Sequence, residues 1–373
     1  MRIVHVADSF APDVGGIESQ VQSLAQAQQR AGHDVSVITA VHAHAELGFP
    51  VARARRGRWL TVAFPWVNRK MVGEVLDAGP DDPPVDIVHA HLSVVSPLGV
   101  YVVRAATRRN IPVAVTVHSL WWKVTPAAWA TFVPFGWGRI RAAWSAVSTV
   151  AAARVRRVLP LVAEVTTLAN LIDVDWWRPA EPPREDDHDA PRLIVVGRLK
   201  KRKHVDEFLD ILARARARVP DQTRAEVSIV GSGPRHDDLQ QQINDLGLGD
   251  WVTLLGHRTS FEVRALLHTS DLFVAPSRQE AFGIAAFEAR AAGLPVLGYG
   301  GTGLADFIVD GRDGLLPADG VAMVEVLTTL LTAPDELGRL RRHTSTTAPP
   351  IAVADTMAAV DELYRRARAM HQR

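Results

Sequence analysis

Ser277-Arg-Gln-Glu-Ala-Phe-Gly-Ile-Ala-Ala-Phe-Glu288 is the stretch of sequence that decides the fold class of this chain. It follows the strand-like run 271–276 and leads into the apolar helical pattern 285–292, which predicts a strand, a loop and a helix start. A glycine loop before a helix leaves amide groups free at a positive dipole end, which suits a phosphate. Glu280 in the loop and Glu288 on the helix would then bind hydroxyl groups beside it. Two incidental surface acids are the alternative interpretation.

A second group of polar residues lies about eighty positions upstream. The run 192–197 predicts a buried strand, Arg198 stands at its carboxyl end, and Lys203 precedes a predicted helix over 205–218. Ligands of parallel α/β sheets bind just outside the carboxyl ends of strands. Two fixed cations there could neutralise a diphosphate and stabilise it as a leaving group without a metal. A solvated basic turn is the alternative, because residues 200–202 are also cationic.

The beginning of the chain repeats this arrangement. Residues 1–6 predict a first strand, Gly15 and Gly16 form a turn, and a helix is expected through Arg30. Glycine lets the backbone approach a ligand closely at a helix start. The pattern is common after first strands, so it supports a phosphate site only together with the other two.

In combination these motifs resemble the retaining family 4 glycosyltransferases of GT-B fold, enzymes of bacteria that use nucleotide sugars. The resemblance covers nearly the whole chain, and its most specific element is the Glu280-x7-Glu288 motif with the upstream Arg198 and Lys203. Two departures bear on the donor rather than on the activity. Residues 169–173 replace a frequent Pro-Asn-Gly-Val-Asp, and Asp306 stands where glutamate is usual. The supporting motifs are Pro12–Glu18, Ala31–Val35, Asp86–His91, Val115–His118, Val230–Pro234 and Gly300–Gly314.

The resemblance implies an α/β fold with two Rossmann-like, doubly wound parallel-sheet domains facing a central cleft. It also implies residue roles. Catalysis falls to His118, Glu280, Arg198 and Lys203, with His118 at the end of the predicted strand 113–117 near the transferred sugar. The donor would be bound by Gly15, Gly16, Arg198, Lys203, Gly231, His257, Glu280, Phe282, Gly283, Ile284 and Glu288.

Composition agrees with a two-domain cytoplasmic enzyme. A chain of 373 residues that is 47% hydrophobic exceeds one ordinary core. The absence of cysteine excludes disulfides, thiolate metal sites and cysteine nucleophiles. We expect no signal peptide, because the sequence opens directly into a strand, and no apolar run is long enough to span a membrane. A net charge of +1 lacks the excess of basic residues that is typical of nucleic-acid-binding proteins, so we expect no nucleic-acid partner.

The order of elements predicts the domain boundaries. Strand and helix patterns alternate over 1–175, and a charged, proline-rich segment without periodicity follows at 176–191, which is typical of a linker. Alternation resumes over 192–350 as a donor domain. The last segment, 351–373, predicts an amphipathic helix, and in the resembled fold that helix crosses back onto the first domain.

Three motifs suggest other chemistry and are weaker. Residues 298–303 match the G-x-G-x-x-G dinucleotide fingerprint, but only a short helical stretch follows them. Asp173 and Asp175 resemble a metal-binding Asp-x-Asp, although they lie beside the linker. The histidines are mostly scattered in sequence, and His89 and His91 lack further zinc ligands that the sequence can place. We therefore expect no metal and no cofactor apart from the nucleotide sugar substrate.

An aromatic and basic region follows His118. Trp121 and Trp122 begin it, and a second patch contains Arg56 and Arg58. Tryptophan beside cations favours an anionic bilayer interface. A buried aromatic cluster that lines an acceptor pocket explains the same residues equally well. Both interpretations indicate a bulky, partly apolar acceptor, and the first adds a peripheral membrane location.

The sequence therefore predicts a retaining hexosyltransferase that uses a GDP- or UDP-linked sugar and an acceptor hydroxyl, the acceptor being lipid-linked, a cell-envelope glycan or a small molecule. A GT-B epimerase and a non-catalytic sugar-nucleotide-binding protein are the alternatives. The base, the sugar, the acceptor, the linkage and the oligomeric state do not follow from the sequence.

Overall fold

The computed structural model describes residues 1–13, 15–43, 46–54, 65–77, 79, 83–121, 140–159, 162, 164–180 and 190–372. Within these residues the chain divides into two compact units. Unit 1 combines Met1–Ile172 with Val353–Arg373, and unit 2 is Asp173–Ala352. The sequence pattern predicts the first boundary at 175/176 and the second at 350/351.

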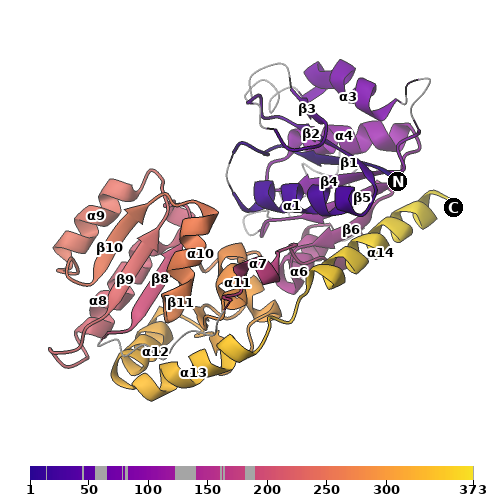
Figure 1. The fold of residues 1–373 in the computed structure, drawn as a ribbon. Helices are drawn as coiled ribbons and strands as arrows, with labels where there is room; N and C mark the ends of the chain where they lie inside the picture. Colours follow the sequence, from indigo (N-terminus) through magenta and orange to yellow (C-terminus); the bar gives the residue numbers. More distant parts are fainter. Residues whose placement is uncertain are drawn as a thin grey trace. The chain divides into compact units, whose positions relative to one another are not determined.

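Unit 1 is built on a parallel sheet of seven strands in the order β3-β2-β1-β4-β5-β6-β7 (Figure 1). Its central strands are buried and mainly apolar, as is usual where helices cover both faces of a sheet, but β1 and β4 also carry buried histidines. The strands are β1 (Arg2–Ala7), β2 (Asp34–Thr39), β3 (Val51–Arg53), β4 (Ile87–Leu92), β5 (Val113–Val117), β6 (Ala143–Ala146) and β7 (Val165–Thr167).

The helices of unit 1 include the last helix of the chain, α14, drawn in yellow in Figure 1. Its residues Val360, Leu363 and Tyr364 share a buried core with Ile3 and Leu24 from the start of the chain. The C-terminal segment therefore completes the core of the first unit. The helices are α1 (Gly16–Arg30), the 3₁₀ helix η1 (Pro65–Asn68), α3 (Arg69–Leu76), α4 (Pro97–Arg108), α6 (Thr149–Val158) and α14 (Val353–His371).

Unit 2 is built on a parallel sheet of six strands in the order β10-β9-β8-β11-β12-β13. Its core joins the apolar faces of α8 and α12 to the sheet. The strands are β8 (Arg192–Val196), β9 (Glu226–Val230), β10 (Val252–Gly256), β11 (Leu272–Ala275), β12 (Val296–Gly298) and β13 (Gly314–Leu315).

Two long helices of unit 2, α10 and α12, begin at residues whose side chains cap them. Thr259 and Glu262 form a reciprocal capping box on α10, and the Asp319 side chain accepts from the Ala322 amide at the start of α12. The helices are α7 (Val174–Trp177), η3 (Lys201–Lys203), α8 (Val205–Arg216), α9 (His236–Asp245), α10 (Ser260–His268), α11 (Ile284–Ala291), η4 (Gly303–Asp306), α12 (Gly320–Thr332) and α13 (Pro334–Thr346).

The predicted fold class of two doubly wound parallel sheets is confirmed. In the described part of the chain, no helix is both long and apolar enough to cross a membrane. Asp173, considered above as a metal ligand, instead caps α7, because its side chain accepts from the Trp176 amide at 3.1 Å.

Candidate active site

The order of strands in unit 2 reverses between β8 and β11, and this reversal brings the two main motifs together. The two strands are parallel neighbours, with Leu272 opposite Leu193, so the segments that follow them emerge at the same edge of the sheet. Arg198 and Lys203 follow β8, and the loop containing Glu280 follows β11. A crevice at such a reversal is where open α/β sheets bind their ligands.

Lys203 and Glu280 are bonded to each other. The Lys203 Nζ lies 2.7 Å from the Glu280 Oε2, with the lysine side chain 27% and the glutamate side chain 19% exposed. A second link joins the same segments, since the Ser277 hydroxyl donates to the Arg202 carbonyl at 3.2 Å. The sequence indicated both ionic residues but not this contact. An ammonium group has three donors, so Lys203 can hold Glu280 and still donate to a second anion.

Arg198 is exposed at the end of β8. Among the described residues, no acidic side chain lies within ion-pair distance of its guanidinium. A planar guanidinium without a carboxylate partner is suited to binding two phosphate oxygens at once. One side of the site therefore has two cations: Arg198, which has no carboxylate partner among the described residues, and Lys203, which is bonded to Glu280.

Gly283 shapes the loop between Glu280 and α11. Its φ of 96° is left-handed, and a Cβ there would lie 2.5 Å from the Leu304 side chain and 3.3 Å from the Glu280 Cγ. Glycine is therefore required both for conformation and for space. The residue caps α11, so the first amides of that helix, beginning at Ile284, start beside the Glu280 side chain.

The Phe282 side chain is buried, which leaves only its backbone available to the site. Its side chain is 2% exposed and packs against Phe287 and Phe307, with ring centroids 5.6 and 5.2 Å apart. The predicted donor-binding role of Phe282 is thus restricted to its main chain, and its ring anchors the loop in the core.

Glu288 lies one turn into α11, and burial raises the pKa of its carboxyl to about 8. The structure gives this carboxyl no hydrogen-bond partner among the residues that it describes. A protonated carboxyl can both donate and accept hydrogen bonds. Glu288 can therefore accept a hydrogen bond from one hydroxyl group and donate one to a neighbouring hydroxyl group.

Gly231 and His257 follow β9 and β10. Gly231 has a φ of 145°, and a Cβ there would lie 1.8 Å from the Gly197 carbonyl oxygen, so close backbone approach alone requires glycine at this position. Its amide donates to the Gly256 carbonyl at 2.8 Å. His257 is exposed immediately afterwards. Their predicted contacts with a donor remain predictions.

In unit 1 the order of strands reverses between β1 and β4. Gly15 caps α1 in extended conformation, and Gly16 is the first helical residue. Nearby, the Asp8 carboxylate accepts from the Leu98 and Gly99 amides, both at 3.0 Å. The N-terminus of α4 is therefore already engaged by a protein carboxylate. The α1 N-terminus after Gly15 remains the predicted anion site of this unit.

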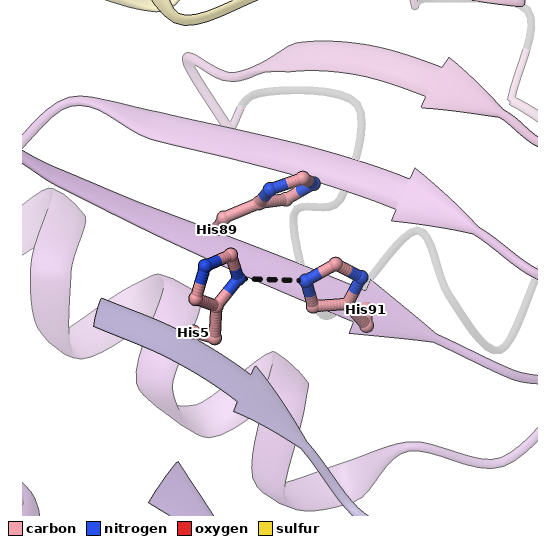
Figure 2. Close-up of side chains that lie close together, drawn as sticks. All are labelled: His5, His89 and His91. Carbon is pink, nitrogen blue, oxygen red and sulfur yellow. Dashed lines mark hydrogen bonds between the residues drawn. The ribbon is translucent and has the colours of Figure 1, made fainter. Parts of the chain in front are cut away.

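The fold gathers histidines that are far apart in sequence and places His5 beside His89 and His91, a neighbour that the sequence did not indicate. His5 on β1 and His89 and His91 on β4 point toward one another on one face of the sheet (Figure 2). The His5 Nδ1 and the His91 Nε2 lie 2.9 Å apart, and the His91 Nδ1 lies 3.0 Å from the Nε2 of His118, which follows β5. The predicted catalytic histidine is thus the partly buried end of a buried chain of imidazoles.

These histidines stay neutral because they are buried. Burial lowers the pKa of His5 to about 4 and that of His118 to about 3. The pKa values of His89 and His91 are also well below the usual value, first through burial and then through the neighbouring imidazoles. His118 therefore enters any reaction near neutral pH without a charge.

Part of the predicted acceptor or membrane region lies outside the described residues, namely Arg56, Arg58 and Trp122. Trp121 is described and is 7% exposed. Trp144, from the same aromatic region, is a core residue of β6 at 1% exposure, so it belongs to the sheet. Arg53, at the start of the basic patch, donates to the carbonyls of Ala11 and Val41.

Two family models match the chain. The model described as Glycosyltransferase Family 4 matches residues 14–176, and the model described as Glycosyl transferases group 1 matches residues 179–347. The two matches follow one another along the sequence and together cover every strand of the two sheets except β1. The family matches and the sequence motifs therefore indicate the same family over most of the chain.

Curated relatives share a quarter to a third of their aligned residues. Glycogen synthase of Mycobacterium tuberculosis is 32% identical over 190 residues, which are 49% of this chain and 44% of that protein. The chain thus spans less than half the length of this relative. Alpha-D-kanosaminyltransferase of Streptomyces kanamyceticus is 27% identical over 333 residues, which are 82% of this chain and 82% of that protein.

Solved structures share the fold at low identity. The Anabaena protein Alr3699/HepE, crystallised with UDP and glucose, superposes with a TM-score of 0.75 at 18% identity, over 97% of this chain and 98% of that one. Sucrose-phosphate synthase from Thermosynechococcus elongatus gives a TM-score of 0.76 at 20% identity, over 99% and 100%. At these identities the likeness establishes the architecture alone.

Proposed function

Because this chain belongs to the family 4 glycosyltransferases of GT-B fold, we propose that it transfers a hexose from a nucleoside diphosphate sugar to an acceptor hydroxyl with retention of configuration. One observation carries the proposal. Lys203 and Glu280, from opposite sides of the strand reversal in unit 2, are bonded at 2.7 Å beside the N-terminus of α11. The site thus combines the Lys203 cation, the Glu280 carboxylate, which can accept hydrogen bonds from hydroxyl groups, and the first amides of α11.

The residues divide the work of binding and charge stabilisation. Arg198, Lys203 and the first amides of α11 hold the diphosphate and stabilise the negative charge that develops as it leaves. Glu280 accepts hydrogen bonds from the donor sugar, and Glu288 binds the ribose hydroxyls. As the family resemblance implies, the leaving phosphate oxygen takes the proton of the acceptor.

The donor is identified by binding before turnover. A nucleotide sugar that binds the folded protein raises its melting temperature by mass action, so UDP- and GDP-linked sugars are screened by thermal shift. The best donor is then offered with a panel of acceptors, and the product's anomeric configuration is read by NMR. Release of nucleoside diphosphate that depends on the acceptor supports transfer. A changed donor sugar without an acceptor indicates an epimerase, and no stabilisation by any donor contradicts the proposal.

We propose that catalysis is metal-independent, because Arg198 and Lys203 supply the positive charge that a divalent ion would otherwise place on the diphosphate. Activity should persist in excess EDTA. Complete loss that added Mg²⁺ or Mn²⁺ restores would contradict this assignment.

We further propose a lipid-linked or cell-envelope acceptor at an anionic membrane surface. Trp66 on η1 is 57% exposed, and the adjacent Arg69 and Lys70 are exposed. Each such cation adds about 1 kcal/mol of attraction near an anionic surface, and salt screens it. Cosedimentation with anionic vesicles should weaken with salt and in the R69A/K70A variant. Equal recovery of protein with and without vesicles would leave a soluble acceptor.

A further inference from the structure

A continuous chain of hydrogen bonds runs from α1 through the sheet of unit 1 to His118. The Gln28 Oε1 lies 2.7 Å from the His5 Nε2. The His5 Nδ1 lies 2.9 Å from the His91 Nε2, the contact drawn in Figure 2, and the His91 Nδ1 lies 3.0 Å from the His118 Nε2. Gln28, His5 and His91 are between 0% and 2% exposed.

The chemistry of the first acceptor fixes the direction of every later bond. A carboxamide oxygen only accepts, so the proton of His5 is on Nε2. A neutral imidazole carries one proton, so the His5 Nδ1 must accept from the His91 Nε2. By the same rule the His91 Nδ1 accepts, and the His118 Nε2 donates. The bond that one ring nitrogen makes thus sets the tautomer at the next ring.

We infer that Gln28, His5 and His91 are positioning residues that hold the His118 proton on Nε2, so that His118 meets its ligand only as a hydrogen-bond acceptor through Nδ1. The identity of that ligand, a hydroxyl of the sugar donor or of the acceptor, rests on the proposed function. A hydroxyl group has the donor that such a nitrogen requires. An imidazole with its proton on Nδ1 would instead compete with that hydroxyl.

A second branch of hydrogen bonds leaves Gln28 and does not reach His118. The Gln28 Nε2 donates to the Tyr364 hydroxyl at 2.9 Å, which lies 3.0 Å from the His89 Nδ1. The His89 Nε2 is 2.7 Å from the Thr116 hydroxyl, and the branch ends through Ser145 at a backbone carbonyl. His89 therefore matches His91 in strand, face and burial, but it lies off the path to His118.

A metal site is the competing interpretation of this cluster. One nitrogen from each of His5, His89 and His91 lies within 4.8 Å of the other two, and in the described chain no carboxylate joins the group. All six ring nitrogens of the three residues already have hydrogen-bond partners in the protein. A dication would break several of these bonds in a buried site without a compensating charge. The hydrogen-bonded chain explains every nitrogen.

The protein without substrate provides the direct test. In protein labelled with ¹⁵N-histidine, ¹⁵N chemical shifts distinguish a protonated ring nitrogen from one with a lone pair, and His118→Asn identifies the His118 signals. The expected result is a protonated Nε2 and an unprotonated Nδ1. A proton on Nδ1 overturns the inference, as does a zinc titration that moves the signals of His5, His89 and His91 together. Neither outcome depends on the enzyme's activity.

Matched variants test whether the chain acts on catalysis. His91→Leu and Gln28→Leu should populate both tautomers of His118 and lower kcat by about ten- to a hundredfold, the range for residues that orient a site residue from behind. His89→Leu should lower the melting temperature similarly, yet keep the His118 tautomer and leave kcat near the wild-type value. An unchanged His118 tautomer in His91→Leu and Gln28→Leu, or equal kcat losses in His89→Leu and His91→Leu, would overturn the inference.

Discussion

Unit 1 and unit 2 are both built on a parallel sheet whose strand order reverses once, but their buried polar clusters differ in kind. In unit 1, His5, His89 and His91 are neutral and exchange hydrogen bonds beneath α1 and α14. In unit 2 the contacts that join distant segments include ion pairs, with Arg290 at 1% exposure bonded to Asp313 and the partly buried Lys203 bonded to Glu280. Neutral imidazoles cost less free energy to bury than charged groups, and each ring sets the direction of the next hydrogen bond. An ion pair holds two charges in place, and losing one partner leaves the other charge buried at a high cost in stability.

The buried arginine of unit 2 gives the largest expected effect on stability. Arg290 donates to Asp313 at 2.8 Å and to the carbonyls of Thr344 and Thr347, which joins α11 to the end of α13. Arg290→Met should lower the free energy of unfolding by about 3–5 kcal/mol. The variant leaves Asp313 buried with only the Val309 amide and His343 beside it. Urea unfolding measures the change.

The control is an arginine ion pair at the surface of the same unit. Arg339 and Glu336 are 47% and 36% exposed, so Arg339→Met should lower the free energy of unfolding far less than Arg290→Met does. Comparable losses in the two variants would show that burial does not distinguish the two ion pairs.

The ion pair of the candidate site should matter for turnover rather than for folding. Lys203→Ala removes a preorganised cation, so we expect kcat to fall by about a hundredfold or more. The partly exposed position should leave the melting temperature within a few degrees of the wild-type value. Lys201→Ala, two residues away and exposed, is the matched control, and steady-state kinetics should leave it near wild type. Wild-type turnover in Lys203→Ala would remove the lysine from the mechanism.

The histidines of unit 1 should make the protein sensitive to acid. Their pKa values are lower in the folded than in the unfolded protein, and that of His5 is about 4. Between pH 6.5 and 4 the unfolded state therefore binds more protons, and the free energy of unfolding falls as the pH falls. His89→Leu should make this dependence shallower, measured by urea unfolding from pH 7 to 5. The same slope in the variant and the wild type would contradict the assignment.

Glu288 should produce a smaller dependence of opposite sign. Its pKa is about 8 in the folded protein, so between pH 4.5 and 8 the folded state binds more protons and stability falls as the pH rises. Glu288→Gln should remove this component. Glu336→Gln is the control, because the bond to Arg339 lowers the pKa of Glu336 and keeps it ionised across this window. A Glu288→Gln profile parallel to the wild type would mean that Glu288 ionises normally.

The sequence-based predictions succeed where a short run of residues determines the element by itself. Strand β5 (Val113–Val117) has the predicted bounds, and β11 (Leu272–Ala275) lies within the predicted run 271–276, because each is a mainly apolar run bounded by polar or proline residues. The short strand β6 was missed, since Ala143-Trp-Ser-Ala146 has no run of β-branched residues and lies in the aromatic region. The predicted helix over 205–218 ends instead at Arg216.

The site required information that no local pattern contains. The positions of Arg198, Lys203 and Glu280 at strand ends follow from parallel topology, but the Lys203–Glu280 bond spans 77 residues and depends on β8 lying beside β11. The imidazole chain had a usable signal. His89 and His91 alternate onto one face of a strand, and His5 stands directly opposite His89 once β1 is paired with β4.

The discontinuity of unit 1 has a consequence for the order of assembly during synthesis. A ribosome completes all of unit 2 before it makes α14, and domains generally fold as their residues emerge. Until then the first sheet lacks Val360, Leu363 and Tyr364 from its core and one partner of His89. The histidine face therefore lacks the cover of α14 while the second sheet is made, and the bond between Gln28 and Tyr364 closes a separation of 336 positions of sequence.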